Sequence, residues 1–173
     1  QLPEGEFEVE VLEFEQNDAS ILFKIYESWS ELSIALQSFG ARGVNLPEGL
    51  SESAFCLAKN MWRVNSGIVG AKSSFDCYDP NEAVGKNRVQ VKACSVLPDL
   101  TSFGPNSVWD KIFFVDFSEW RKRNGEFHIY EINTEDINNY PVNANQTLLE
   151  QKEQGRRPRF SIYKGLIKNN LYI

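Results

Sequence analysis

The chain of 173 residues is 42% hydrophobic and 24% charged, which is ordinary for a soluble globular protein folded as one domain. No signal peptide opens it and no apolar run approaches the roughly 20 residues of a membrane span, so we expect a cytoplasmic protein without membrane contact. A single histidine, His128, and three cysteines without metal-ligand spacing argue against histidine catalysis and a zinc site, and favour reduced, buried thiols at Cys56, Cys77 and Cys94.

The net charge of −6 is unevenly distributed along the chain. Residues 1–50 carry two basic against ten acidic side chains, whereas residues 151–173 carry six basic against one acidic. The acidic total argues against a nucleic-acid partner, but a groove that is basic only locally is sufficient for DNA binding.

Two helices are predicted in the first third of the chain, after an edge strand suggested by the alternating residues 6–15. Polar residues at 17–20 favour a helix start, and apolar spacings of three and four predict a helix over 21–39 that ends at Gly40. Its expected core side chains are Leu22, Tyr26, Trp29, Leu32, Leu36 and Phe39.

The second helix is predicted to follow the turn at Pro47, with Ser51 as its N-cap, and to run to about Trp62. Glu52 then falls in the first turn, where the helix dipole favours an acid. That capping role alone accounts for an acid at this position. The sharper interpretation is that Glu52 points toward the strand of Asp76, either as a direct metal ligand or as a residue that supports the ligands.

The chain is organised around residues 74–96, which predict two strands, 74–78 and 88–96, joined by a turn. Gln90 and Lys92 share one face of the second strand, and Asp76 on the first strand can reach them across the hairpin. An acid, an oxygen ligand and a lysine at one hairpin suit Mg²⁺-assisted hydrolysis of a phosphodiester. The alternative is that these side chains form only the solvated face of an antiparallel strand.

Two further strands are predicted over 109–117 and 127–132, joined as a hairpin by a basic turn. Two helices followed by four strands indicate an α+β fold in which helices flank a central sheet. A helix is predicted near 147–154. The arginines that follow it are either a solvated loop or contacts to phosphates and guanine edges, and residues 160–163 would anchor them to the domain.

With these blocks in place, the chain resembles type II restriction endonucleases of the PD-(D/E)xK superfamily, over roughly residues 20–165. The resemblance is carried by residues 41–52, by Phe75-Asp76 with Gln90-Val91-Lys92, by residues 99–110, and by Arg156-Arg-Pro-Arg-Phe-Ser-Ile. It implies a nuclease-like mixed central sheet flanked by helices and a prokaryotic cytoplasmic enzyme. It also implies a homodimer that cuts double-stranded DNA at a short palindrome and leaves 5′-phosphates.

The resemblance assigns catalytic roles residue by residue. Asp76 matches the first metal-binding acid, Lys92 the catalytic lysine, and Glu52 the acid found on a helix in many members. Gln90 occupies the position of the usual second acid; its amide oxygen still ligates a divalent ion, but one negative charge is lost. The implied metal ligands are Asp76, Gln90 and Glu52, for one or two Mg²⁺ ions, with Asp79 and Glu82 as the nearby acids that would restore the charge.

DNA contacts are expected at Arg42, Asn45, Arg88, Thr101, Ser102, Arg156, Arg157 and Arg159, and the basic side chains of Arg63, Lys72 and Lys86 are further candidates for holding the backbone. The chain would then comprise an N-terminal segment and helix (1–40), a catalytic core (41–137) and a basic DNA-contacting segment (138–173). Two alternatives stay open: a repair or structure-selective nuclease of the same superfamily, and a DNA-binding module that has lost catalysis. The orientation of Gln90 relative to Asp76 would help to separate them.

Overall fold

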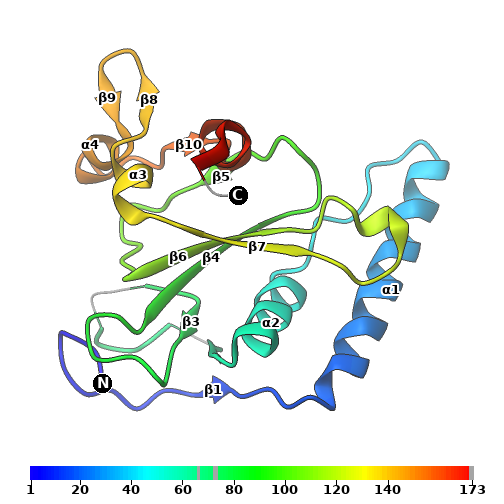
Figure 1. Cartoon of the computed structure of the whole chain (residues 1–173), viewed down its shortest axis with the longest axis horizontal. Coiled ribbons are helices and arrows are strands. Elements are labelled where there is room, and N and C mark those ends of the chain that lie inside the picture. The colour runs from blue at the N-terminus through cyan, green and yellow to red at the C-terminus, as the bar shows by residue number, and fades with distance from the viewer. Residues whose placement is uncertain (66, 72–73, 172–173) are drawn as a thin grey trace.

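A computed structural model describes residues 1–65, 67–71 and 74–171, and within this part of the chain six strands form one sheet in the order β1-β2-β3-β4-β6-β7 (Figure 1). Neighbouring strands are antiparallel except β4 and β6, which run parallel. The mixed sheet with its helices confirms the predicted α+β class. The strand bounds are β1 Val11–Leu12, β2 Trp62–Val64, β3 Cys77–Tyr78, β4 Arg88–Cys94, β6 Lys111–Asp116 and β7 His128–Ile132.

Strand β6 separates two hydrophobic cores. Phe113 and Val115 belong to one core, whereas Ile112 and Phe114 belong to the other, because successive side chains of a strand point to opposite faces. Burial on both faces explains the nearly continuous apolar run in this strand. Its antiparallel pairing with β7 confirms the predicted hairpin.

The first core lies between the sheet and the helices α1 (Asp18–Ser38) and α2 (Glu48–Lys59). In α1, Tyr26 and Trp29 are buried as predicted, but Leu32 is 53% and Phe39 92% exposed. The expectation for Leu32 and Phe39 was wrong because the buried stripe follows Tyr26 and Trp29 to two small buried residues, Ser30 and Ser33. Leu32 and Phe39 lie outside that stripe.

Helix α2 begins four residues earlier than predicted. Pro47, not Ser51, is the N-cap, and its carbonyl accepts the backbone N–H groups of Leu50 and Ser51, each at 3.1 Å. The helix ends at Asn60, which adopts a left-handed conformation with φ 54°, so it stops short of Trp62. The earlier start places Glu48 in the first turn and Glu52 one turn later.

The second core is covered by the C-terminal third of the chain, which lies on the other face of the sheet (Figure 1). Strand β5 pairs antiparallel with β10, and Phe160 and Ile162 are buried, so the predicted anchoring of this segment is confirmed for both side chains. Thr147 forms a capping box with Glu150, which explains the helix predicted there. The remaining elements are β5 Thr101–Ser102, η1 Trp120–Lys122, α3 Thr134–Asn138, β8 Pro141–Asn143, β9 Gln146–Thr147, α4 Leu148–Glu153, β10 Arg159–Phe160 and η2 Tyr163–Leu171.

The cysteines, all three within the described ranges, are free, as expected. Cys56 and Cys77 are buried side by side with their sulfur atoms 3.2 Å apart, and Cys94 is half-buried. None of the helices in the described residues is both long and apolar enough to span a membrane.

Candidate active site

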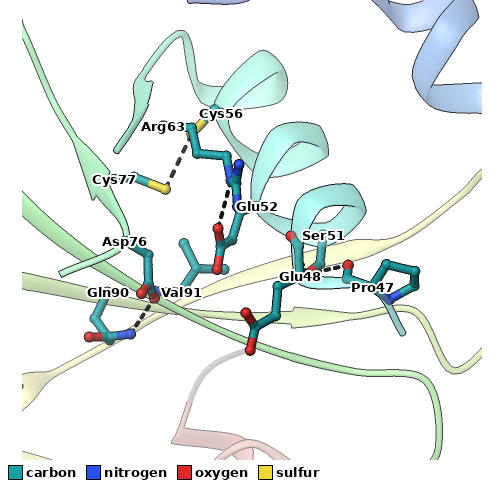
Figure 2. A network of polar contacts seen from close by, with 10 residues as sticks. All are labelled: Pro47, Glu48, Ser51, Glu52, Cys56, Arg63, Asp76, Cys77, Gln90 and Val91. Carbon is teal, nitrogen blue, oxygen red and sulfur yellow. Dashed lines mark hydrogen bonds and ion pairs between the residues drawn. The ribbon is translucent and has the colours of Figure 1, made fainter. Parts of the chain in front are cut away.

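Asp76 immediately precedes β3 and is held by the sheet on both sides. Its backbone N–H donates to the carbonyl of Val89 at 3.1 Å, and its own carbonyl accepts from Val64 at 3.0 Å. The carboxylate Oδ2 accepts the backbone N–H of Val91 at 2.8 Å and the side-chain amide of Gln90. These contacts fix the carboxylate against the middle of β4 (Figure 2).

Gln90 is only 4% exposed. The alternative hypothesis, that this strand face is solvated, is therefore wrong for Gln90. Its Nε2 donates to Asp76, which leaves the amide oxygen on the far side of the group. Gln90 therefore does not point away from the predicted site. In this orientation it supports Asp76 through a hydrogen bond.

Helix α2 adds two carboxylates. Glu48 and Glu52 are four residues apart and so lie on one face of the helix, and both side chains extend toward the strands that carry Asp76 and Gln90 (Figure 2). Glu52 Oε2 accepts the Nε–H of Arg63, from β2, at 2.7 Å. The group of Glu48, Glu52 and Asp76 is named the cleft cluster below.

In the cleft cluster, burial makes the charged forms of Glu52 and Asp76 unfavourable. Burial, followed by the charge of Asp76, raises the pKa of Glu52 to about 7, against the lowering effect of Arg63. Burial also raises the pKa of Asp76, although the Val91 N–H and the charge of Lys92 oppose the rise. Carboxylates in such surroundings gain from a bound cation.

Lys92 lies on β4 two residues beyond Gln90. Burial lowers the pKa of its ammonium, with Asp76 acting in the opposite direction. Its Nζ lies 5.6 Å from the centre of the Phe103 ring, and no carboxylate oxygen of the described chain lies within the 4.0 Å of an ion pair. The ammonium of Lys92 is thus near the carboxylates but forms no ion pair with them among the described residues.

Two clefts meet at the cleft cluster, and Glu48, Glu52 and Asp76 line both. The main cleft, of about 630 Å³, contains Gln90 and Lys92 and is also lined by the predicted DNA contacts Arg42, Asn45, Thr101 and Ser102. The second cleft, of about 510 Å³, extends to the other side, past Arg63. The Ser102 hydroxyl is buried and has no hydrogen-bond partner among the described residues.

The other predicted DNA contacts lie outside the residues that line the main cleft. Arg88 forms a bidentate pair with Asp110, at 2.6 and 3.0 Å, and a longer contact with Glu4 at 3.7 Å. Arg156, Arg157 and Arg159 are exposed around β10, which pairs with β5 at the edge of the main cleft. Lys86 is exposed in the turn before β4, and Lys72 lies outside the described residues.

Asp79 and Glu82, the acids expected to replace the charge lost at Gln90, form ion pairs outside the site. The Nζ of Lys111 lies 3.5 Å from Asp79 and 2.7 Å from Glu82, and neither acid lines the main or the second cleft. Glu48 takes the position beside Glu52 and Asp76 that these two residues were expected to fill. The four-residue spacing between Glu48 and Glu52 could have identified Glu48 from the sequence. The helix was predicted to start at Ser51, however, and this start left Glu48 outside it.

Within the described ranges no three His, Cys, Asp or Glu side chains are grouped as a ready-made metal site. Mg²⁺ does not require such a group, since it commonly binds one or two carboxylates, several waters and a substrate phosphate. The hard oxygen donors of Asp76 and Glu52 fit that mode. With Lys92 nearby, the arrangement can bind a divalent cation and balance negative charge on a phosphate.

Comparison with known proteins gives two significant matches. A family model described as Bsp6I restriction endonuclease matches residues 14–169. The type II restriction enzyme Bsp6I of Bacillus sp. (strain RFL6) is 35% identical over 150 residues, which cover 85% of this chain and 79% of that protein. No solved structure gives a significant match.

Proposed function

Because the chain belongs to the Bsp6I restriction endonuclease family and is a type II restriction enzyme, we propose that the cleft cluster and Lys92 form its catalytic centre. A type II restriction enzyme is a site-specific deoxyribonuclease. The observation that carries the assignment is the meeting of Asp76, Glu52 and Lys92 at one cleft, with perturbed pKa values of opposite sense. Strongly perturbed groups gathered in a cleft mark functional sites more often than structural ones.

The family assignment favours sequence-specific cleavage over the repair-nuclease and binding-module alternatives. We assign the centre to the PD-(D/E)xK type, with Asp76 as its first acid and Lys92 as its lysine. Gln90 replaces the second acid, and Glu48 and Glu52 from α2 supply negative charge in its place. The hydrogen bond from Gln90 to Asp76 supports a positioning role for Gln90, although its free amide oxygen leaves it a candidate ligand.

The residues present fit a magnesium ion held by Asp76 and Glu52, with Glu48 beside them. A bound Mg²⁺ would polarise the scissile phosphate and lower the pKa of a bound water. Asp76 is prepared for this role because the Val91 N–H fixes one of its oxygens. Glu52 would bring a second carboxylate from the helix while Arg63 holds its orientation.

Lys92 would act on the attacking water and on the phosphate oxygens. Its ammonium can orient the water and balance the negative charge that develops at phosphorus. The water oxygen forms a bond to phosphorus while the bond from phosphorus to the 3′ oxygen breaks. The products would be a 5′-phosphate and, after protonation of the leaving oxygen, a 3′-hydroxyl.

DNA binding is assigned to two groups of side chains. The first group consists of Arg42, Asn45, Thr101 and Ser102, which line the main cleft beside the catalytic centre. The second is the basic segment of Arg156, Arg157 and Arg159 within residues 138–173. Arg88 is the weakest of the predicted contacts, because Asp110 occupies its guanidinium.

We further propose that the enzyme acts as a homodimer on a short palindrome. Each chain carries one catalytic centre, and cutting both antiparallel strands symmetrically requires two centres related by a twofold axis. Sedimentation of the free protein and of its complex with DNA would show whether two chains are present.

The catalytic assignment is tested by plasmid cleavage in Mg²⁺, comparing wild type with Asp76→Ala and Lys92→Ala. Discrete bands from wild type and none from either variant are expected, with DNA binding in Ca²⁺ retained. The ends of the bands give the recognition sequence and the cleavage position. Cleavage that survives in both variants would place the catalytic centre elsewhere in the chain.

A further inference from the structure

The second cleft is separate from the main cleft but begins at the same carboxylates. Beyond Glu48, Glu52 and Asp76 its lining is mixed, and Arg63, Asn65 and Asn106 are the polar residues with N–H donors on its walls. It therefore offers hydrogen-bond donors in a cleft that Lys92 does not line. Nothing in the catalytic assignment uses these donors except the single N–H of Arg63 that holds Glu52.

The walls of the second cleft are fixed by the sheet and its connections. Arg63 belongs to β2 and pairs with Cys77 of β3, the residue that follows Asp76. Asn106 lies in a turn that is closed by the hydrogen bond from Ser107 to Gly104, at 3.2 Å, and tied to Ser74 by the N–H of Val108, also at 3.2 Å. Donors on fixed backbone are suited to hold a ligand in one place.

The chemistry of these donors suits a phosphate. An arginine carries five N–H donors in a planar fork, and the recorded hydrogen bond of Arg63 uses one of them. Asn106 is exposed, and its side-chain amide can donate two hydrogens to phosphate oxygens. The carboxylates at the mouth of the cleft would repel a phosphate unless a divalent cation neutralises them.

A DNA strand must continue in both directions from the bond that is cut. The main cleft and the second cleft both begin at the cleft cluster, and only the main cleft is lined by Lys92. We propose that the second cleft holds the strand on one side of the cut bond, with Arg63 and Asn106 binding the phosphodiester next to the scissile one. This proposal rests on the catalytic role assigned to the cleft cluster.

The test measures whether the loss of a protein hydrogen-bond donor and the loss of charge at one phosphate have additive effects on DNA affinity. After the cleavage position has been mapped, duplexes are made with an uncharged methylphosphonate at the linkage on either side of the scissile phosphate. Affinity is measured by fluorescence anisotropy in Ca²⁺ for wild type and Asn106→Ala, with Asn81→Ala as a matched control at an exposed position outside both clefts. Arg63→Lys is a second variant, which keeps the charge and loses the fork.

On one side of the cut, the neutral linkage should weaken wild-type and Asn81→Ala binding by about tenfold. The same linkage should weaken Asn106→Ala and Arg63→Lys by about threefold or less, because the partner of the phosphate is already lost. The coupling should disappear when the divalent ion is removed. Equal losses in all four proteins, on both sides of the cut, would overturn the proposal.

This test can fail without the catalytic assignment failing. If Asp76→Ala and Lys92→Ala lose cleavage but no coupling to Asn106 or Arg63 is found, only the second-cleft proposal is rejected. If those two variants still cleave, the catalytic assignment fails and the proposal fails with it.

Discussion

Two groups of acids, which come nearest in sequence at Asp76 and Asp79, differ in their electrostatics. In the cleft cluster, Glu52 and Asp76 are half-buried and Glu48 is exposed, and burial raises the pKa values of Glu52 and Asp76. The second group consists of Asp79, Glu82 and Asp110 and is called the ion-paired cluster. It is neutralised by Lys111 and Arg88.

Asp110 and Glu82 of the ion-paired cluster show pKa shifts in the opposite direction. Burial tends to raise the pKa of Asp110, but the hydrogen bonds from Arg88 outweigh it and the net shift is downward. The hydrogen bond from Lys111 lowers the pKa of Glu82. Charges paired in this way serve the fold, whereas the carboxylates of Glu52 and Asp76, whose pKa values are raised, would be stabilised by a bound cation.

The same substitution in each cluster should give opposite results, and this is the largest effect we predict. Asp76→Asn removes the carboxylate at the centre and should lower the cleavage rate by about 10³-fold or more. Asp110→Asn should leave cleavage per folded molecule unchanged and lower the Tm by roughly 3–8 °C, because Arg88 loses its bidentate partner. Single-turnover cleavage and thermal unfolding of both variants measure the two outcomes.

A reversed result would break the comparison. If Asp110→Asn abolished cleavage in the folded enzyme while Asp76→Asn only lowered the Tm, the ion-paired cluster would be the functional one.

Glu48→Gln should reduce cleavage by about 10²-fold, because the centre loses one of its three charges. Glu48 also stands in the first turn of α2, where loss of an acid costs about 0.3–1 kcal/mol of helix stability. The two roles separate by titration with Mg²⁺. A ligand role predicts that excess Mg²⁺ recovers part of the lost rate, and a purely helical role predicts a small Tm decrease with the normal Mg²⁺ dependence.

Glu48 also shows what the sequence could and could not predict. Local patterns were sufficient for the alternation of β4, the hairpin of β6 and β7, and the capped helix α4. They were insufficient for the start of α2, because Ser51 and Pro47 are both acceptable N-terminal residues and tertiary packing selects between them. That error of four residues hid the acid that stands one turn before Glu52.

Ion pairs between residues far apart in the sequence could not be predicted from local patterns. Asp79 and Glu82 were reasonable candidates by proximity to Asp76, but Lys111, which arrives on β6, pairs with both. The parallel alignment of β4 with β6 that brings Lys111 there has no local signature. Gln90 was placed on the correct strand, yet only the structure indicates that its amide nitrogen faces Asp76.

The raised pKa of Glu52 predicts a pH effect on stability that the ion-paired cluster should not show. Between its ordinary value of 4.5 and about 7, folded Glu52 retains a proton that the unfolded chain releases. Folded stability attributable to this group therefore falls as pH rises through that window. In EDTA, Glu52→Gln should have a Tm about 2–6 °C above wild type at pH 8, and the difference should vanish near pH 5.

Cleavage should respond to the same group in the opposite direction. The ionised carboxylate is the form that binds a cation, so at limiting Mg²⁺ the wild-type rate should rise as pH increases toward 7 and beyond. Glu52→Gln should be nearly inactive throughout. A Tm difference between wild type and Glu52→Gln that is independent of pH would show that Glu52 is already ionised in the folded protein.

The smallest effect should come from Glu82, which is exposed enough that water screens its pair with Lys111. Glu82→Gln should change the Tm by about 1 °C or less and leave the cleavage rate within about twofold of wild type. The variant is a demanding control, because it removes an acid close to Asp76 in sequence without touching the cleft cluster. A large loss of cleavage in Glu82→Gln would mean that any negative charge near the hairpin contributes to cleavage. The two clusters would then not be functionally distinct.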